Sequence, residues 1–366
     1  MLRYRMDRRA LLAGAGATAL VTVSGSRLRA QTTRRGGNLV IAVPGGSSAN
    51  TLDPRGFGSP YMAVLGGTIY NTLTEVEGPT TELKPGLADS WSSPDEGLTW
   101  IFELVSGAKF HDGRPVRAAD VIYSYKLHVA EGSRSNSRAI IGAVADMTAE
   151  GDTRLSLRLK AANFFFPAQL SNFNLCILPE GSDPASGIGS GPYKVDRFAP
   201  GEILEASRFD GYFKSDRAFM EKVELLAVND PAARTSAVQS GEAQVVMLVD
   251  ARSAPLLQDL ATYTIQNLPG SGFNGVNMRV DAPPFDSLAL RQAIKAAVNR
   301  ADIIQRVFNG FAQAGNDHPI PPSSQYFDST APQWTHDPDR ARQLYAESGH
   351  KGSIILQTSE DRKSVV

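Results

Sequence analysis

Apolar side chains follow two periods along this chain, one typical of strands and one typical of helices. Strand-like segments, in which apolar residues run together or alternate with polar ones, are residues 38–43, 98–105, 154–159, 193–198, 223–228, 243–248, 262–268, 275–280 and 353–358. Helix-like segments, with apolar residues at helical spacing, are residues 61–73, 117–131, 231–240, 287–299, 300–309 and 338–348, and a short helix is expected within 163–170. Because strands and helices interleave, the pattern predicts an α/β protein.

One strand–helix–strand unit occupies residues 223–248. Its helix, at 231–240, ends at Gly241 and separates two apolar runs by enough residues for a crossover connection. Such a unit places its two strands parallel in one sheet, joined by a right-handed crossover. We therefore expect a sheet that is parallel at least in part.

The sequence indicates a domain boundary near residue 270, where its composition and pattern change. The chain has 366 residues, a length that favours two domains over one. Gly270, Gly272 and Gly275 match the spacing of a dinucleotide-binding turn, but a strand-like segment and a Pro-Pro turn follow where a helix should begin. We interpret these glycines as a hinge or a close backbone approach, and we expect a domain boundary here.

The first 30 residues have the composition of an export signal. Six arginines stand against one acidic residue, and an uncharged apolar stretch at 10–23 is too short to span a bilayer as a helix. Arg8 and Arg9, followed by an Ala-Leu-Leu run, resemble a twin-arginine signal, with cleavage expected after Ala30. The alternative is an amphipathic or membrane-anchoring helix. Removing the signal shifts the formal net charge from −1 to about −6. Because the first 30 residues direct export and no apolar stretch is long enough to span a bilayer, we expect a soluble periplasmic protein.

Charge and motif content exclude several classes of function. Lys and Arg total 37 and Asp and Glu total 38, so no electrostatic argument supports a nucleic-acid partner. The chain has no nucleophile-elbow, zinc-protease, phosphate-loop or EF-hand motif, and its five histidines lack metal-ligand spacing. We therefore predict neither an enzyme nor a cofactor or metal site. An exported hydrolase on a similar scaffold stays as the alternative.

Individual reactive side chains have simpler structural explanations. Cys176 lies among apolar neighbours and is interpreted as a buried small side chain, and a single Cys excludes an internal disulfide. His128 falls on a helix and His111 beside a turn, where a core or solvated histidine is expected. Asp112 and Asp120, which could form a carboxylate pair, are explained by a turn and a helix start.

Several ordered blocks carry a family resemblance. The segments 87–91, 98–104, 109–115 and 119–125 resemble the signature of the family 5 extracellular solute-binding proteins, the dipeptide and oligopeptide type that serves ABC importers. Further blocks agree in order, at 52–54 with 69–73, 189–194 with 211–213, 229–235 with 239–242, and 277–285 with 290–294 and 299–300. The aromatic residues of these blocks are expected in the core rather than at a ligand, namely Trp91, Trp100, Phe102, Phe110, Tyr123 and Tyr125.

The resemblance implies a two-lobed periplasmic-binding-protein fold of type II, in which hinged lobes close on a ligand in the cleft. Residues 1–30 would be the signal, 31–270 lobe I and 271–366 a partial lobe II. Full members are longer, so we expect lobe II to be incomplete and unstable by itself. The implied partners are a small-molecule ligand and the permease subunits of an ABC transporter, with the chain acting as a monomer.

The resemblance also places candidate ligand contacts by position. They are Ser47, Ser48 and Asn50 after the first strand, Tyr70, Tyr193 in the loop 189–193, and Ser271, Gly272, Phe273 and Asn274 at the crossover between lobes. For each of them, structural support is the alternative role. Peptides are the leading ligand, ahead of opines, glutathione-like compounds, sugars and nickel chelates. Presentation of a ligand to a chemoreceptor is the non-transport alternative.

Overall fold

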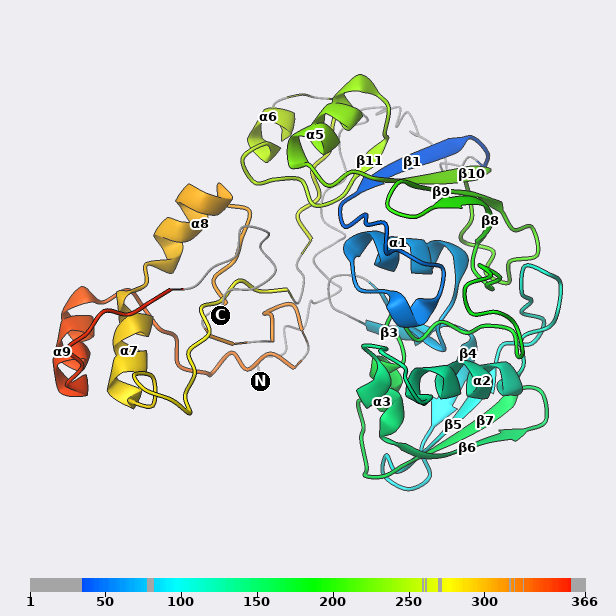
Figure 1. Cartoon of the computed structure of the whole chain (residues 1–366), viewed down its shortest axis with the longest axis horizontal. Coiled ribbons are helices and arrows are strands. Elements are labelled where there is room, and N and C mark those ends of the chain that lie inside the picture. The colour runs from blue at the N-terminus through cyan, green and yellow to red at the C-terminus, as the bar shows by residue number, and fades with distance from the viewer. Residues whose placement is uncertain are drawn as a thin grey trace, which may run out of the picture. The chain divides into compact units, whose positions relative to one another are not determined.

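The computed structural model of the chain describes residues 35–77, 82–258, 260, 262–268, 272–315, 317–318, 320–324 and 326–356 (Figure 1). The chain divides into two units, Met1–Arg34 and Arg35–Val366, and every described residue belongs to the second. The predicted export signal at 1–30 therefore lies outside the described residues. Within the described ranges, none of the helices has the length and apolar character needed to cross a bilayer.

Five strands form a mixed sheet in the order β11-β1-β10-β9-β8 (Figure 1). Their bounds are β1 Asn38–Val43, β8 Tyr193–Ala199, β9 Ile203–Arg208, β10 Lys222–Ala227 and β11 Val245–Val246. β1 pairs in parallel with β10 on one side and with β11 on the other, whereas β9 is antiparallel to both β8 and β10. β1 is thus the centre of the parallel part of the sheet.

The unit predicted at 223–248 forms from β10, α5 (Pro231–Ser240) and β11. Its two strands run parallel, as expected, but they do not pair with each other because β1 lies between them. β1 suits this place because it is apolar at every position after Asn38, and a strand covered on both faces needs apolar side chains on both.

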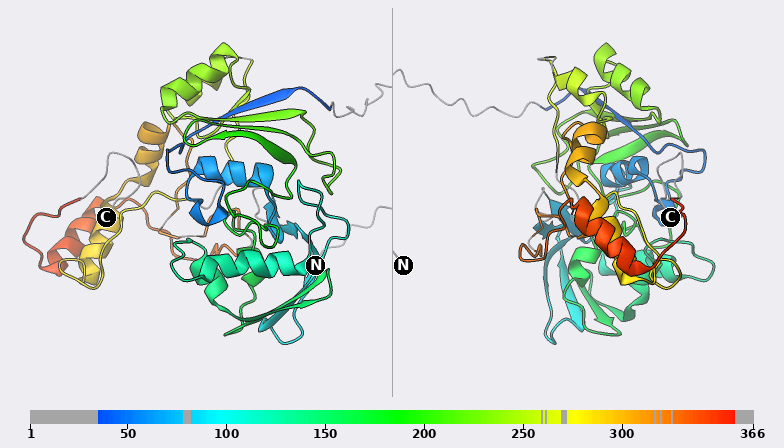
Figure 2. Two further views of the ribbon diagram at one scale, coloured as in Figure 1. Left: turned by 45° about the vertical axis from the view of Figure 1, so that its right-hand side comes forward. Right: turned by 90° about the vertical axis from the view of Figure 1, so that its left-hand side faces the viewer.

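The two faces of this sheet are covered by different helices. Leu39, Ile41 and Val43 of β1 pack into a cluster that includes α1 (Pro60–Ile69), whereas Val40 and Ala42 pack with Ala237 of α5. Successive side chains of a strand point to opposite faces, so α1 and α5 lie on opposite sides of the sheet. Figure 2 shows the same arrangement, with the sheet between the two helices.

Both helices begin at a residue whose side chain caps the first turn. The Ser59 hydroxyl accepts a hydrogen bond from the Met62 amide, and the Asp230 carboxylate accepts one from the Ala233 amide at 2.7 Å. Proline occupies the first turn of each helix, where its missing N–H costs nothing. α5 ends at Gly241, whose φ of 81° lies in the left-handed region.

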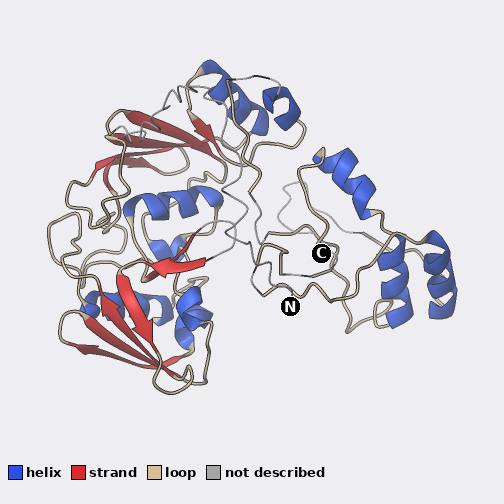
Figure 3. Cartoon of the chain, turned by 180° about the vertical axis from the view of Figure 1, so that it is seen from behind, coloured by secondary structure: helices blue, strands red, loops and turns tan. Residues whose placement is uncertain are grey.

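A second sheet is antiparallel, in the order β4-β5-β7-β6, and α2 and α3 cover one of its faces (Figure 3). The bounds are β4 Ala88–Ser92, β5 Thr99–Leu104, β6 Val144–Glu150, β7 Arg154–Leu159, α2 Ala118–Val129 and α3 Arg138–Gly142. The buried face carries alternate residues of β5 and β7, namely Trp100, Phe102, Leu104, Leu155, Leu157 and Leu159. The opposite face is mostly polar, with Ile101 as an exception on β5, and carries Glu103 and Arg154, which form an ion pair of 2.9 Å.

The aromatic residues expected in the core lie there. Trp100, Phe102, Phe110 and Tyr125 are buried, and Trp91 and Tyr123 are partly buried against the same two clusters, which are the largest that the described residues form. Cys176 is also buried, as the sequence predicted. The blocks that carry the family resemblance therefore contribute mainly to the core.

Several short elements have no clear periodicity and were not predicted. They include the strands β2 (Thr74–Glu77), β3 (Glu82–Pro85), β4, β6 and β9, the 3₁₀ helix η1 (Pro54–Gly56), and the helices α3 and α6 (Ala254–Gln258). The short helix expected within 163–170 is α4 (Phe166–Gln169). β6 shows why such strands escape detection, since only Val144 of its seven residues is buried.

The helices predicted in the last third of the chain are present as α7 (Leu288–Ala297), α8 (Arg300–Phe308) and α9 (Pro338–Ser348). α7 and α9 pack against each other, and both bury small and apolar side chains on one face. The Asp337 amide donates a hydrogen bond to the Ala296 carbonyl oxygen at 2.9 Å, which ties the start of α9 to the end of α7.

Three predicted strands are wrong for the residues that can be assessed. Residues 262–268, 275–280 and 353–356 form no strand, and residues 357–358 lie outside the described ranges. Their apolar side chains are largely exposed, including Leu268 at 69% and Ile355 at 79%. A strand exists only when a neighbour accepts its hydrogen bonds, and no described residue pairs with these segments.

Candidate functional site

The carboxyl ends of the parallel strands form a topological switch point. β1 leads to α1 on one face of the sheet, and β10 leads to α5 on the opposite face. In open α/β sheets the connections diverge at such a point and leave a crevice outside the carboxyl ends of the strands, where ligands bind. The candidate site is therefore the edge formed by residues 44–50, 228–230 and 247–250, called the carboxyl edge below.

Asn229 holds the loop that follows β1. Its Oδ1 accepts hydrogen bonds from the amides of Gly45 at 2.8 Å and Gly46 at 3.1 Å, and its Nδ2 donates to the Gly46 carbonyl oxygen at 2.9 Å. A Cβ on Gly46 would lie 2.4 Å from the Cβ of Ala227, so only glycine lets the loop come this close to the end of β10. The start of the loop is consequently fixed before any ligand arrives.

The predicted contacts Ser47, Ser48 and Asn50 lie in this loop. Asn50 Oδ1 accepts from the Ser47 amide at 2.7 Å, and the Asn50 amide donates to the Ser47 carbonyl oxygen at 2.9 Å. The Ser47 hydroxyl accepts from the Ala49 amide at 3.2 Å. Ser47 and Ser48 are exposed, so the structure places these three residues together in a closed turn at the carboxyl edge.

Arg234 joins the ends of β10 and β11 at the same edge. Its Nη1 donates to the carbonyl oxygens of Val228 and Asn229, both at 2.8 Å, and its Nη2 donates to that of Leu248 at 3.0 Å. The side chain is buried, and burial lowers the pKa of the guanidinium from its ordinary value. One buried cation therefore binds carbonyl oxygens of the two segments that follow β10 and β11.

Sequence reasoning did not single out Asn229 or Arg234, although both fall within the family-like block 229–235. The available signal was an Asn directly after a buried strand and an Arg inside a helix whose neighbours are small. Neither feature identifies a site residue unless its hydrogen-bond partners are known. The partners of Asn229 are Gly45 and Gly46, which lie far from it in the sequence.

The loop 189–193 lies at the other end of α1. The α1 helix starts beside Pro44, whose carbonyl oxygen accepts from the Tyr61 amide, and it ends where Gly191 donates its amide to the Ile69 carbonyl oxygen at 3.1 Å. A Cβ on Gly189 would lie 1.8 Å from the same Ile69 oxygen. This loop therefore packs against the backbone of α1, away from the carboxyl edge.

His111 completes that packing through main-chain contacts. Its Nε2 donates to the Gly191 carbonyl oxygen at 3.0 Å, and its Nδ1 accepts from the Gly189 amide at 3.3 Å. Burial lowers the pKa of His111, which favours the neutral ring that this pair of contacts requires. The structural role expected for His111 agrees with this geometry.

Two of the predicted aromatic contacts use their hydroxyl groups within the core. Tyr70 is buried and donates to the Leu52 carbonyl oxygen at 2.8 Å. Tyr193 is 8% exposed, and its hydroxyl accepts from the Met220 amide at 3.2 Å. These contacts favour the structural alternative for both residues.

Of the four residues predicted at the crossover, Ser271 lies outside the described residues. Gly272, Phe273 and Asn274 are exposed in a segment without helix or strand, and 69% of Phe273 is accessible. Their role in ligand binding stays a prediction.

Among the residues that the structure describes, no three or more His, Cys, Asp or Glu side chains converge as metal ligands would. The carboxylate of Asp120 accepts from the amides of Arg117 and Glu180, each at 2.7 Å, which fixes the start of α2. Asp112 accepts from the Arg114 amide at 3.1 Å within its turn. The two carboxylates therefore have the structural roles that the sequence favoured.

Comparison with known proteins agrees with this geometry. A family model described as bacterial extracellular solute-binding proteins, family 5 middle, matches residues 82–364. The glutathione-binding protein GsiB of Escherichia coli O6:K15:H31 is 27% identical over 326 residues, which cover 86% of this chain and 62% of that protein. GsiB of Pectobacterium atrosepticum is 27% identical over 328 residues, 85% of this chain and 61% of the relative. The chain thus spans about three fifths of the length of these relatives.

Solved structures share the fold at lower identity. The periplasmic binding protein DppA of Helicobacter pylori, in complex with the peptide STSA, has a TM-score of 0.70 and 23% identity over 87% of this chain and 67% of its own. AgaA from A.tumefacien R10, in complex with agropinic acid, has a TM-score of 0.68 and 24% identity over 86% and 64%. NikZ from Campylobacter jejuni, in complex with Ni(L-His), has a TM-score of 0.68 and 19% identity over 89% and 64%. These likenesses confirm the predicted α/β periplasmic-binding-protein fold.

Proposed function

Because this chain belongs to the bacterial extracellular solute-binding proteins of family 5, we propose that it is the substrate-binding subunit of an ABC importer. It captures a small solute outside the cytoplasmic membrane and delivers it to the permease. The observation that carries the proposal is the carboxyl edge, where Asn229 fixes the loop 45–50 at the switch point of the sheet. A ligand-binding wall of this kind is built in advance and needs no catalytic group.

The physical basis of capture is a shift between open and closed populations. A solute that contacts the carboxyl edge and a second lobe at once gains contacts only in the closed form. Its differential affinity for the closed form then determines how far the population moves. The five-stranded sheet, covered on both faces by α1 and α5, supplies one rigid wall for such closure.

We propose peptides as the ligand class. The family resemblance left glutathione-like compounds as an alternative to peptides, but glutathione is itself a tripeptide, and we now include it in this class. The support is that the curated relatives bind glutathione and that DppA and the oligopeptide-binding protein AppA were solved with bound peptides. The second candidate is a non-peptide solute, supported by the neighbours solved with agropinic acid and with Ni(L-His). Polar main-chain groups such as those of loop 45–50 suit a ligand with many donors and acceptors.

A thermal-shift series tests the proposal. The purified chain is heated alone and with glutathione, the tetrapeptide Ser-Thr-Ser-Ala, agropinic acid or Ni(L-His). A ligand present at about one hundred times its Kd stabilises the folded state by about 2.7 kcal/mol and raises the Tm. We expect a rise with one of the peptides and with neither non-peptide solute. A rise with agropinic acid or Ni(L-His) alone would favour the second candidate, and no rise with any of them would reject the binding function for this chain.

The proposal includes export through residues 1–30 and action as a monomer in the periplasm. The support is the basic, apolar and small-residue order of this segment, together with its paired Arg8 and Arg9. Export by a general secretory route, without the twin-arginine pathway, is the alternative.

A further inference from the structure

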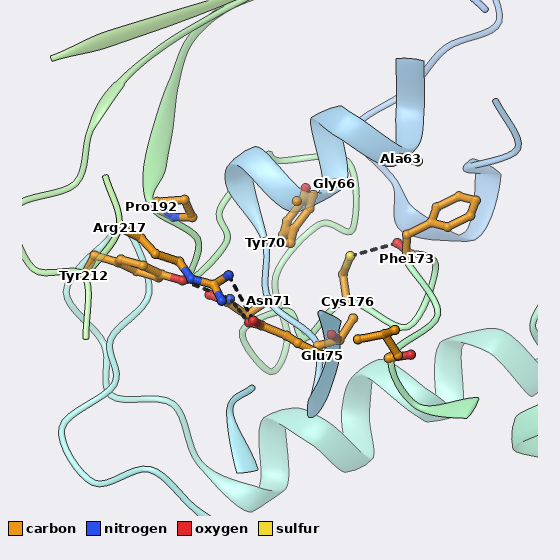
Figure 4. A pocket seen from close by; sticks show the side chains of 14 residues that line it. Ala63, Gly66, Tyr70, Asn71, Glu75, Phe173, Cys176, Pro192, Tyr212 and Arg217 are labelled. Carbon is orange, nitrogen blue, oxygen red and sulfur yellow. Dashed lines mark hydrogen bonds and ion pairs between the residues drawn. The ribbon is translucent and has the colours of Figure 1, made fainter. Parts of the chain in front are cut away.

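A cavity of about 330 Å³ lies beside the C-terminal half of α1 (Figure 4). α1 has ten residues and is about 15 Å long, and it begins at the carboxyl edge. No residue of the loop 45–50 lines the cavity, and nothing in the proposed function uses it. Its volume is within the range of sites for small molecules, at roughly 300–1,000 Å³.

One end of this cavity lies beside two cations that share the carboxylate of Glu75. The Glu75 Oε2 atom is 2.8 Å from Lys214 Nζ and 3.0 Å from Arg217 Nη1. The side chains of Glu75 and Lys214 are only 17% and 16% exposed, whereas that of Arg217 is 39% exposed. Two cations thus share one carboxylate, and of the two only Arg217 lines the cavity. Asp216 is a second carboxylate near this end, since its charge adds to burial in raising the pKa of Tyr212. A bound anion would therefore be held by the hydrogen-bond donors of Arg217 rather than by a net charge of the cluster.

Two hydrogen-bond donors at this end have capacity to spare. Arg217 forms an ion pair with Glu75 through Nη1, and no hydrogen bond of its Nε or Nη2 to another described residue is found, so these groups can bind a ligand. The Tyr212 hydroxyl accepts from Asn71 Nδ2 at 3.3 Å and keeps its own proton for donation. Burial raises the pKa of Tyr212 to about 12, so the hydroxyl stays protonated at neutral pH. Figure 4 shows Tyr212, Arg217, Asn71 and Glu75 converging.

The rest of the lining is small or apolar. It includes Ala63, Gly66 and Gly67 of α1, with Val76 from β2, a residue that is 45% exposed. A Cβ on Gly67 would meet no atom within 4 Å, so this face of α1 is open toward the cavity. An apolar wall beside convergent donors is the usual construction of a site for a small amphipathic molecule.

We propose that this cavity binds a small organic carboxylate. The carboxylate lies against Arg217 and Tyr212, and the apolar body of the molecule lies along the Gly66 and Gly67 face of α1. An arginine with two free donor groups suits a planar carboxylate, because charge-assisted hydrogen bonds to it are about twice as strong as neutral ones. A neutral molecule of the same shape makes no charge-assisted hydrogen bond with Arg217 and should bind more weakly.

The experiment uses benzoate as the probe and benzamide as its neutral isostere, both titrated into the full chain by ligand-observed NMR. We expect saturable binding of benzoate and binding of benzamide at least tenfold weaker. Arg217→Gln should weaken benzoate binding at least tenfold, and Gly67→Leu should abolish it by filling the cavity from an open helical position. Arg197→Gln is the matched control. Arg197 forms an exposed ion pair of 2.8 Å with Glu205 and does not line the cavity, so this variant should bind benzoate as the wild type does.

The proposal is overturned if the wild-type chain shows no saturable benzoate binding, or if Arg217→Gln or Gly67→Leu binds benzoate as well as the wild type does. Circular dichroism of each variant shows whether it folds. Gly67→Leu keeps the test decisive if Arg217→Gln does not fold, since leucine is a good helix former at an exposed site. Glutathione or peptide binding at the carboxyl edge should be unchanged in Gly67→Leu, which separates this proposal from the proposed function.

Discussion

Asn229 and Gly46 are joined in both directions, because Asn229 Oδ1 accepts from the Gly46 amide at 3.1 Å and Asn229 Nδ2 donates to the Gly46 carbonyl oxygen at 2.9 Å. The two residues are 183 positions apart in the chain. Their contact connects the end of β10 to the loop after β1. It therefore decides the shape of the carboxyl edge at which we place the ligand.

Replacing Asn229 should loosen this loop. In Asn229→Ala the amides of Gly45 and Gly46 lose their acceptor, and their hydrogen exchange should speed up about tenfold or more. The free energy of unfolding should fall by about 1–3 kcal/mol, because polar groups lose their partners. Asn229→Asp keeps both acceptor contacts and loses only the donor, so it is the matched control and should preserve the protection of the amides. Equal exchange in the wild type and Asn229→Ala would contradict the assigned role.

Gly189 should not tolerate a side chain. Its Cβ would lie 1.8 Å from the Ile69 carbonyl oxygen, which belongs to a backbone that cannot move freely. Gly189→Ala should therefore lower the free energy of unfolding by about 3 kcal/mol or more, measured by urea denaturation. Gly142→Ala is the control, because a Cβ there meets nothing within 4 Å, and it should be neutral or slightly stabilising. Similar unfolding curves for the two variants would show that the loop 189–193 is not packed as described.

Arg234 should be more sensitive than an exposed arginine. Arg234→Met removes the donor for three carbonyl oxygens at the carboxyl edge and should lower the free energy of unfolding by about 2–4 kcal/mol. Arg197→Gln removes an exposed ion pair and should cost less than about 1 kcal/mol. Urea denaturation of the two variants makes the comparison. If Arg234→Met lowers the free energy of unfolding no more than Arg197→Gln does, Arg234 does not hold the carboxyl edge together as we describe.

Stability should fall as the solution becomes acidic, in part through His128. This ring is buried on α2, and its Nδ1 contacts the Ser135 hydroxyl oxygen at 2.6 Å. Burial lowers its pKa to about 4, from an ordinary value of 6.5 in the unfolded chain. Between these two pH values the unfolded state binds more protons than the folded state. The contribution of His128 to the free energy of unfolding is therefore fully present above about pH 6.5 and is lost toward pH 4, by up to about 3 kcal/mol.

Chemical denaturation across this pH range measures the effect. His128→Asn has no ring to protonate, so part of the pH dependence should disappear even if its overall stability is lower. His111 has a lowered pKa for the same reason, and it should account for a share of the slope that remains. An unchanged slope in His128→Asn would contradict the assignment.

Export should depend on the arginine pair of the predicted signal. Replacing Arg8 and Arg9 together with Lys should hold the precursor in the cytoplasm if the twin-arginine route operates. Cell fractionation and immunoblotting of a tagged chain measure the distribution, with Arg3→Lys as a control outside the pair. Undiminished export of the double variant would instead favour a general secretory signal.

Local patterns in the sequence were sufficient for many elements. β1 and β7 have the bounds predicted from their apolar patterns, and α5 begins and ends at the cap residues that its sequence contains. Capping and periodicity act over a few residues, so the sequence expresses them directly. The core position of Cys176 was predictable for the same reason, from its apolar neighbours.

Pairing was less predictable, because a strand depends on partners elsewhere in the chain. The segments 262–268 and 275–280 have apolar residues suited to strands, but no described residue pairs with them. Conversely, β6 has little apolar pattern and forms because β7 accepts and donates its hydrogen bonds. Propensity therefore proposes a strand, and tertiary pairing decides whether it forms.

The candidate site divides in the same way. From the sequence alone came the family resemblance, the loop with Ser47, Ser48 and Asn50, and the structural roles of Asp120 and His111. Only the tertiary structure decided that β1 lies between β10 and β11, and that this order brings Asn229 to Gly46 while it leaves Tyr70 and Tyr193 in the core. The physical reason is that side-chain type and spacing record local preferences, whereas contacts across 183 residues depend on how the sheet is assembled.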